Sequence, residues 1–337
     1  MHMLPYYEGC RDDRYNPVLT DMQLKNVINR FKTEEACIHH LFRERWPEGF
    51  VCPACGGFGA YEIRTRRLPL YQCKNCRHQT SLIAGTVMEG SRTPLCKWMV
   101  ALQLMSLECG VTAVRLASIL SVTYKTAWRM LHKIRLAISR LESNEPLTGE
   151  IKIGLAHYGR FKSMRVPRKQ PVLVGISLQY GTEPNETPPR RDDRDLMRSG
   201  NRPASRATGP SEKRSLPAGN TPFSRTCEKP LRVKMKLIPQ KESEHPRFVE
   251  NYPEFVKLQQ RPGFCRIQRI PPLTPRLGNM LPQLFCHAKT WIDRTFHGLG
   301  TKHAQLYWDE FCYRRNLSFS EVPVFPHLTR LCLSSAV

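Results

Sequence analysis

Two short cysteine pairs constrain this chain more than any other feature. Cys52 and Cys55 form one C-x2-C pair, Cys73 and Cys76 form a second, and seventeen residues lie between the pairs. Four thiolates with this spacing fit a tetrahedral Zn²⁺ site of the ribbon type. Because all four ligands come from the protein, we expect the site to be structural, with no open coordination position.

The stretch between the pairs, residues 56–72, has the length of a short hairpin. Gly56-Gly57 supplies a turn after the first pair, and residues 61–63 and 68–71 are expected to pair as strands. Two disulfides, or four ordinary cysteines, are the alternatives. Disulfides need an oxidising compartment, and the other nine of the thirteen cysteines show no pairing pattern. The zinc site is therefore the preferred interpretation.

The charge of the chain narrows what such a module would bind. Among 337 residues there are 52 Lys and Arg against 29 Asp and Glu, a formal net charge of +23. An excess of this size favours a polyanionic partner, most simply nucleic acid, and a merely basic surface is the alternative. No apolar run is long enough to span a membrane, and residues 1–16 do not have the form of a secretory signal. Together with the thirteen cysteines, this predicts a protein of the reducing cytoplasm.

Residues 93–140 have the pattern of three consecutive helices. Thr93, followed by Pro94, is expected to start the first helix, and Thr112 to cap a short second helix. After a three-residue turn, Thr123 is expected to cap a third helix that reaches about Ser139. A short helix, a tight turn and a longer basic helix are typical of a helix-turn-helix. A plain three-helix bundle with a solvated basic face is the alternative.

The third helix is expected to have an apolar stripe and a basic face. The stripe would be Ala127, Trp128, Leu131, Ile134 and Ile138, and the basic face Lys125, Arg129, His132, Lys133 and Arg140. A recognition helix meets base edges and phosphates with the side chains near its start. We therefore predict DNA contacts from Tyr124, Lys125, Thr126, Arg129 and Lys133.

Several segments, in order along the chain, resemble one family of insertion-sequence transposases, the ISXO-type group. They are residues 46–55, 71–81, 84–88, 94–98 and 124–135, and then 288–293, 295–298, 302–303 and 309–316. The family joins an N-terminal zinc ribbon and helix-turn-helix to an RNase-H-like catalytic domain of the DDE superfamily. The resemblance implies that the chain cuts element ends and joins them to target DNA by two-metal phosphoryl transfer with Mg²⁺. It also implies double-stranded DNA, the terminal inverted repeats, as partner, a homo-oligomer, and a place at the bacterial nucleoid.

The same resemblance indicates where the catalytic side chains should lie. The strand of the first carboxylate follows Leu147-Thr-Gly149, but the position of that acid is Gly154, which has no side chain to bind a cation. The sequence context of the second carboxylate is not found in the chain. The third position is His287, and the motif acid Glu310 is expected to be structural. We therefore predict no intact catalytic residues and a lost Mg²⁺ site.

A segment from about residue 180 to 250 is rich in Pro, Arg, Ser and Gly, and we expect it to be disordered. Compensating frameshifts or a replaced segment would explain it, and a natural disordered insertion is the alternative. The expected fold is α+β and multidomain: an N-terminal helical segment (1–45), a zinc ribbon (46–92), a helix-turn-helix (93–145), and an interrupted RNase-H-like remnant (146–337). The predicted function is a catalytically defective transposase. The alternatives are a non-catalytic DNA-binding protein derived from one, and an unrelated zinc-ribbon transcription factor.

Overall fold

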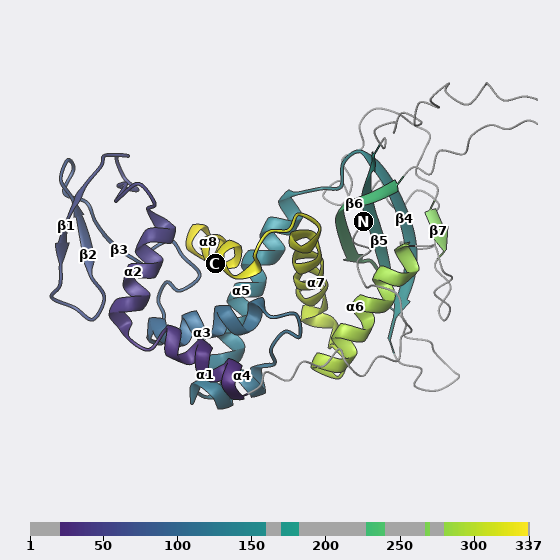
Figure 1. Ribbon diagram of the computed structural model, residues 1–337, viewed down its shortest axis with the longest axis horizontal. Helices are drawn as coiled ribbons and strands as arrows, with labels where there is room; N and C mark the ends of the chain where they lie inside the picture. Colours follow the sequence, from purple (N-terminus) through teal and green to yellow (C-terminus); the bar gives the residue numbers. More distant parts are fainter. Residues whose placement is uncertain (1–20, 160–169, 182–226, 240–266, 270–279, 336–337) are drawn as a thin grey trace, which may run out of the picture. The chain divides into compact units, whose positions relative to one another are not determined.

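The computed structural model describes residues 21–159, 170–181, 227–239, 267–269 and 280–335, which form a mixed α+β structure (Figure 1). The first elements are α1 (Asp21–Arg30), α2 (Glu34–Arg45), β1 (Ala60–Ile63), β2 (Leu70–Cys73), β3 (Gln79–Ser81), α3 (Leu95–Ser106), α4 (Ala113–Leu120) and α5 (Tyr124–Asn144). They are followed by β4 (Glu150–Tyr158), β5 (Gln170–Gly181), β6 (Cys227–Leu237), β7 (Ile267–Arg269), α6 (Met280–Phe296), the 3-10 turn η4 (Thr301–His303), α7 (Ala304–Phe319) and α8 (Val324–Ser334). None of the helices in these ranges has the length and apolar character that a bilayer crossing requires.

The first sheet is an antiparallel meander in the order β1-β2-β3. Ala60 pairs with Cys73 and Ile63 with Leu70, so the hairpin predicted between the cysteine pairs is confirmed. An aromatic cluster joins this sheet to α2. Its ring centroids are 4.9–5.9 Å apart, and its members are Phe42, Trp46, Phe50 and Tyr71. The helix and the sheet therefore share one apolar core.

Helices α4 and α5 begin where their capping residues predict. The hydroxyl of Thr112 accepts a hydrogen bond from the backbone N–H of Arg115, and that of Thr123 from the N–H of Thr126, each at 3.2 Å. Helix α5 continues to Asn144, beyond the predicted end. The extension follows from the packing of its second half against α7, which the local pattern does not contain.

The start of α3 differs from the prediction. The helix begins at Leu95, and Thr93 does not cap it. Instead, the Glu34 carboxylate from α2 accepts the N–H groups of Leu95 at 3.2 Å and Cys96 at 3.5 Å. A carboxylate also interacts favourably with the positive end of the helix dipole. The cap thus comes from a residue about sixty positions earlier, which local sequence rules cannot identify.

The C-terminal helix α8 packs against the N-terminal helices. The ring of Phe325 lies 5.7 Å from that of Phe31, and Arg330 forms a 2.7 Å ion pair with Glu44. The backbone N–H of Val87 donates to the carbonyl of Cys332 at 2.9 Å. One hydrophobic core therefore contains residues from both ends of the described chain.

The second sheet has the strand order β6-β5-β4-β7. β4 is antiparallel to β5, with Gly154 opposite Val174, and parallel to β7, with Gly154 opposite Gln268. The strands predicted near residues 151–156 and 171–174 are confirmed. A second core contains apolar side chains of this sheet and of α6 and α7, among them Val172, Val174, Val233, Ile292 and Trp308.

Strand β6 lies inside the segment predicted to be disordered, and for residues 227–239 that prediction is wrong. Residues 231–237 alternate apolar and basic side chains, a strand pattern that the Pro- and Arg-rich composition of the wider segment hides. Val233 and Met235 are fully buried. The other residues of the predicted disordered segment, 182–226 and 240–250, lie outside the described ranges.

A buried ion pair joins α5 to α7. The Glu310 carboxylate is fully buried, 2.7 Å from Nε of Arg135 and 2.6 Å from Nη2 of Arg314. Burial alone would raise the pKa of Glu310, but the positive charges of Arg135 and Arg314 outweigh it and lower that pKa. Arg314 also donates to the carbonyls of Met105 and Leu107 at the end of α3. Glu310 is therefore structural, as predicted.

The substitution Glu310→Gln should destabilise the protein strongly, because it leaves two buried guanidinium groups without a counter-charge. We expect a loss of about 3–5 kcal/mol in the free energy of unfolding, measured by urea denaturation. The control is Glu62→Gln, which breaks an exposed 2.9 Å pair with Arg64 and should cost about 0.5 kcal/mol or less. Equal losses for the two variants would contradict this account.

Candidate metal centre and nucleic-acid interface

The four cysteines of the two pairs converge on one point. Sγ of Cys52 lies 3.6 Å from Sγ of Cys76, and Sγ of Cys55 lies 3.7 Å from Sγ of Cys73. All four sulfurs lie within 4.8 Å of one another. A tetrahedral site with Zn–S bonds of about 2.3 Å has sulfur–sulfur edges of about 3.8 Å. The sulfur cage therefore has the dimensions of a structural zinc site.

Both cysteine pairs use the same backbone turn. The N–H of Gly56 donates to the carbonyl of Cys52 at 2.9 Å, and the N–H of Arg77 to that of Cys73 at 3.1 Å. Each donor follows the second cysteine of its pair and has a positive φ, 70° for Gly56 and 60° for Arg77. Glycine adopts this conformation freely, whereas for arginine it costs about 1–2 kcal/mol. The second turn is thus held against backbone strain.

The thiols of the second pair have unequal proton affinities. Backbone N–H groups of Cys76 and Asn75 stabilise the Cys73 thiolate and lower the pKa of that thiol to about 7. A backbone N–H of His78 lowers the pKa of Cys76, but the neighbouring sulfur of Cys55 and burial raise it to about 12. A bound dication would displace the remaining protons, so metal affinity should fall in acid. The donor set fits Zn²⁺, which would hold the two turns together.

The predicted DNA-contacting residues divide into two groups. Tyr124, Lys125 and Arg129 are exposed at the start of α5, and the Tyr124 side chain is 57% exposed. Thr126 is half-buried, and its hydroxyl lies 2.9 Å from the hydroxyl of Thr123, within the helix cap. Lys133 is also engaged, since its ammonium donates to the carbonyls of Val87 at 3.1 Å and Glu89 at 3.0 Å. Of the predicted contact residues, Tyr124, Lys125 and Arg129 in the first turns of α5 are therefore the ones whose side chains can reach a ligand.

The predicted faces of α5 need two corrections, one in the apolar stripe and one on the basic face. Trp128 is only half-buried, and its ring stacks on His132 at 4.6 Å. His132 in turn meets His303 edge-on at 4.8 Å, so it is not on a free basic face. Burial, and then the charge of His303, lower the pKa of His132. Met130 and Arg135, which the predicted stripe left out, are both buried.

The two positions implied for catalysis lie on different elements. Gly154 is buried in β4, between its partners on β5 and β7. His287 lies on α6, where burial, and then the charge of Arg315, lower its pKa. Within the described ranges, the four cysteines are the group of side chains that could hold a metal, and neither position belongs to it. The residues at these positions do not fit a pair of Mg²⁺ ions, because Gly154 offers no ligand.

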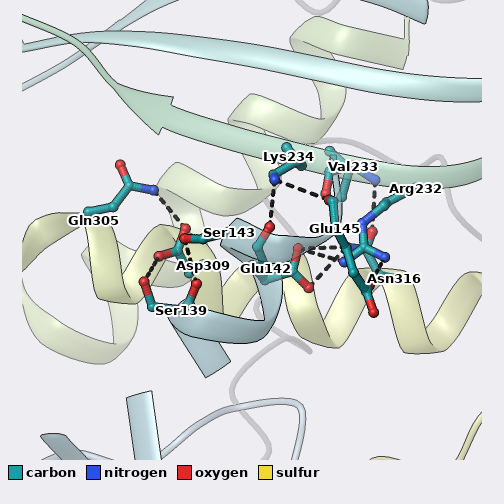
Figure 2. Close-up of polar contacts among 10 residues, drawn as sticks. All are labelled: Ser139, Glu142, Ser143, Glu145, Arg232, Val233, Lys234, Gln305, Asp309 and Asn316. Carbon is teal, nitrogen blue, oxygen red and sulfur yellow. Dashed lines mark hydrogen bonds and ion pairs between the residues drawn. The ribbon is translucent and has the colours of Figure 1, made fainter. Parts of the chain in front are cut away.

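Two other buried acids lie between α5, β6 and α7 (Figure 2). Asp309 accepts hydrogen bonds from Ser139 at 2.6 Å and from Gln305 at 2.7 Å. Burial raises the pKa of Asp309 to about 6, although both donors oppose this shift. A small cleft of about 60 Å³ lies beside these residues, too small for a nucleotide. Both carboxylate oxygens of Asp309 thus have partners within the protein.

Glu142 is held by basic and amide side chains. Arg232 donates to its carboxylate at 3.0 Å, and Asn316 donates to it at 3.3 Å. Lys234 donates instead to backbone carbonyls at the end of α5, those of Glu142 at 2.5 Å and Glu145 at 3.1 Å (Figure 2). Burial raises the pKa of Glu142, and the charge of Arg232 opposes this shift. This cluster joins α5 to the second sheet and serves as a structural junction.

Side-chain amides of α7 cover the outer edge of β6. Asn316 accepts from the N–H of Val233 at 2.7 Å and donates to its carbonyl at 3.1 Å. Gln305 donates to the carbonyl of Met235 at 2.9 Å and accepts from the N–H of Leu237 at 2.8 Å. The two amides pair with alternate residues of β6 as a neighbouring strand would, and so they block the edge. Asn316 lies in the C-terminal segment 309–316, and no local sequence pattern indicates this role.

Replacing a sulfur ligand should remove the metal. We expect Cys52→Ser and Cys73→Ser to reduce bound zinc from about one ion per chain to near zero, measured by atomic absorption after dialysis. The control Cys109→Ser changes a half-buried cysteine outside the cage and should keep full zinc content. Zinc retained by Cys73→Ser, or lost equally by the control, would show that the cage is not the metal site.

Comparison with known proteins agrees with this geometry. Residues 32–79 match the family described as "Transposase zinc-ribbon domain", a range that includes α2 and the four cysteines. Over 116 residues the chain is 28% identical to a Halobacterium salinarum protein described as "Uncharacterized protein in transposable element ISH50". The aligned region is 33% of this chain and 38% of that relative, so the chain spans about two fifths of the relative's length. No solved structure matches the chain significantly. The chain thus contains a transposase-type zinc ribbon and is distantly homologous to an insertion-element protein.

Proposed function

We propose that this chain is a DNA-binding protein derived from an insertion-sequence transposase, and that it has lost the cutting and joining activity. The observation that carries the proposal is the start of α5. There Tyr124, Lys125 and Arg129 are exposed on a helix that Thr123 caps and that α3 and α4 support. The N-terminus of a helix also favours phosphate through its unpaired N–H groups and its dipole.

The proposed partner is double-stranded DNA at the terminal inverted repeats of the element. The transposase-type zinc ribbon supports DNA as the partner, and so does the net charge of +23. Residues 93–145, which include α3, α4 and all of α5, would be the helix-turn-helix, with α5 in the major groove. Two inverted ends suit a symmetric homo-oligomer, which is part of the proposal.

We further propose that residues 146–337 descend from an RNase-H-like domain. The mixed sheet supports this descent, because β4 has an antiparallel neighbour on one side and a parallel neighbour on the other. Apolar side chains of α6 and α7 also share one hydrophobic core with this sheet. An active transposase is the second candidate function, which the retained sheet favours.

The side chains around this sheet support the loss of activity. Two-metal phosphoryl transfer needs carboxylates that converge on ions about 3.5–4 Å apart. The family resemblance assigns the first such group to Gly154, which supplies no ligand. The C-terminal motif contains two buried acids. Glu310 is paired with two arginines, and Asp309 accepts hydrogen bonds from Ser139 and Gln305. Both acids therefore stabilise the packing of α5 against α7.

Removing a phosphate contact should lower both the affinity for DNA and its salt dependence. We expect Lys125→Ala and Arg129→Ala each to reduce the slope of log K against log salt by about 0.9, measured by fluorescence anisotropy on duplex DNA. The matched control is Lys133→Ala. The Lys133 ammonium already donates to the carbonyls of Val87 and Glu89, so its removal should change the slope less. Unchanged slopes for the first two variants would rule out this part of α5 as the reader.

Purified protein should show no cleavage or joining of element ends with Mg²⁺ or Mn²⁺, because the first metal ligand is missing. The assay is strand transfer with labelled end DNA, read on a denaturing gel. Metal-dependent nicking that a single acid-to-amide substitution abolishes would contradict the proposal and identify the missing ligand. Asp309→Asn and Glu142→Gln are the first variants to compare in that case.

A further inference from the structure

We propose that the zinc ribbon carries a second DNA contact, a stacking surface for unpaired bases. The residues proposed for this contact, called here the ribbon patch, are Phe58, Tyr61 and Lys74 of the ribbon. The inference rests on the proposed function, since it assumes that the ribbon meets DNA, and it adds single-stranded DNA as the ligand class. It concerns a part of the chain different from the start of α5.

The ribbon patch exposes two large aromatic rings. Phe58 is 71% exposed and Tyr61 is 62% exposed, more than the Tyr124 side chain on α5. Aromatic side chains usually bury most of their area, so two strongly exposed rings on one small module are unusual and are candidates for ligand contact. Both rings stand on ordered backbone, because Phe58 forms a bridge with Val51 and Tyr61 pairs with Gln72 in the sheet. A rigid backbone lowers the entropy lost when a base stacks on such a ring.

Lys74 places a positive charge beside one of these rings. Its Nζ lies 5.4 Å from the ring centroid of Tyr61, and its backbone N–H donates to the carbonyl of Gly59 at 3.1 Å. The side chain passes directly over Gly59, where an added Cβ would lie 3.3 Å from Cδ of Lys74. Gly59 also has a φ of +83°, which favours glycine. The loop is thus shaped to lay a cation along an exposed aromatic ring.

The charge around the ribbon patch suits a nucleic acid. Between residues 51 and 80 there are five basic side chains, Arg64, Arg66, Arg67, Lys74 and Arg77, and one acid, Glu62. All five basic residues are exposed, and Glu62 is paired with Arg64. A zinc ion with four thiolates would contribute about −2, so the ribbon would remain positive. Positive charge alone would serve a duplex, but exposed rings add stacking, which needs the faces of unpaired bases.

The test uses the full zinc-loaded chain with two probes, single-stranded oligothymidine and a duplex. We expect Phe58→Ala and Tyr61→Ala each to weaken binding to the single strand by about five- to 100-fold, and to change duplex affinity by about twofold or less. Tyr61→Phe should keep single-strand binding. Val322→Ala, at an exposed apolar residue outside the ribbon, should change neither affinity. Zinc content of about one ion per chain verifies that each variant retains the folded ribbon.

Two outcomes would overturn the inference: unchanged single-strand binding, or an equal loss on both probes with zinc retained. Unchanged DNA binding together with a loss of self-association would assign the ribbon patch to a protein partner. Failure of the proposed function is distinguishable, because it would appear as duplex binding that does not respond to Lys125→Ala or Arg129→Ala. The two probes therefore test the two surfaces separately.

Discussion

The buried contact of Glu310 with Arg135 and Arg314 is the interaction on which the described structure depends most. It joins α5 to α7 in the protein interior, and Arg314 extends it to the end of α3 through two backbone carbonyls. Such a group is costly to break, because removing one charge leaves the others buried without compensation. Its value lies in fixing one arrangement of these helices, and we infer that it sets how α5 is held.

Helix α5 consequently has two roles along its length. Its 21 residues span about 32 Å at a rise of about 1.5 Å per residue. The first turns expose Tyr124 and Lys125, whereas the last turns bind Lys234 and Arg232 of β6 through Glu142 (Figure 2). In our account, the helix that is proposed to read DNA is thus also the helix that contacts the second sheet. A substitution in the Glu142 cluster should therefore change DNA binding at the start of α5.

The parts of the fold that sequence predicts are those set by local rules. The caps Thr112 and Thr123 predict the starts of α4 and α5, because each cap joins residues three positions apart. The sulfur cage joins two pairs that lie seventeen residues apart, and it is predictable because each C-x2-C pair is itself local and the interval between the pairs suits a zinc ribbon. The cap of α3 by Glu34 and the binding of Lys133 to the carbonyl of Val87 depend on distant partners, which no local pattern contains. The C-terminal motif shows the same limit. Its helical form is predictable, but the pairing of its Asn316 with β6 exists only in the assembled fold.

The most direct test of the central claim is a hydroxyl-radical footprint of the full zinc-loaded chain on the DNA that borders its own gene. The account predicts protection within inverted repeats at the two ends of the element, and loss of that protection in a Lys125→Ala/Arg129→Ala double variant. Protection confined to promoter sequences, or a footprint that the double variant leaves unchanged, would contradict a transposase-derived reader of element ends.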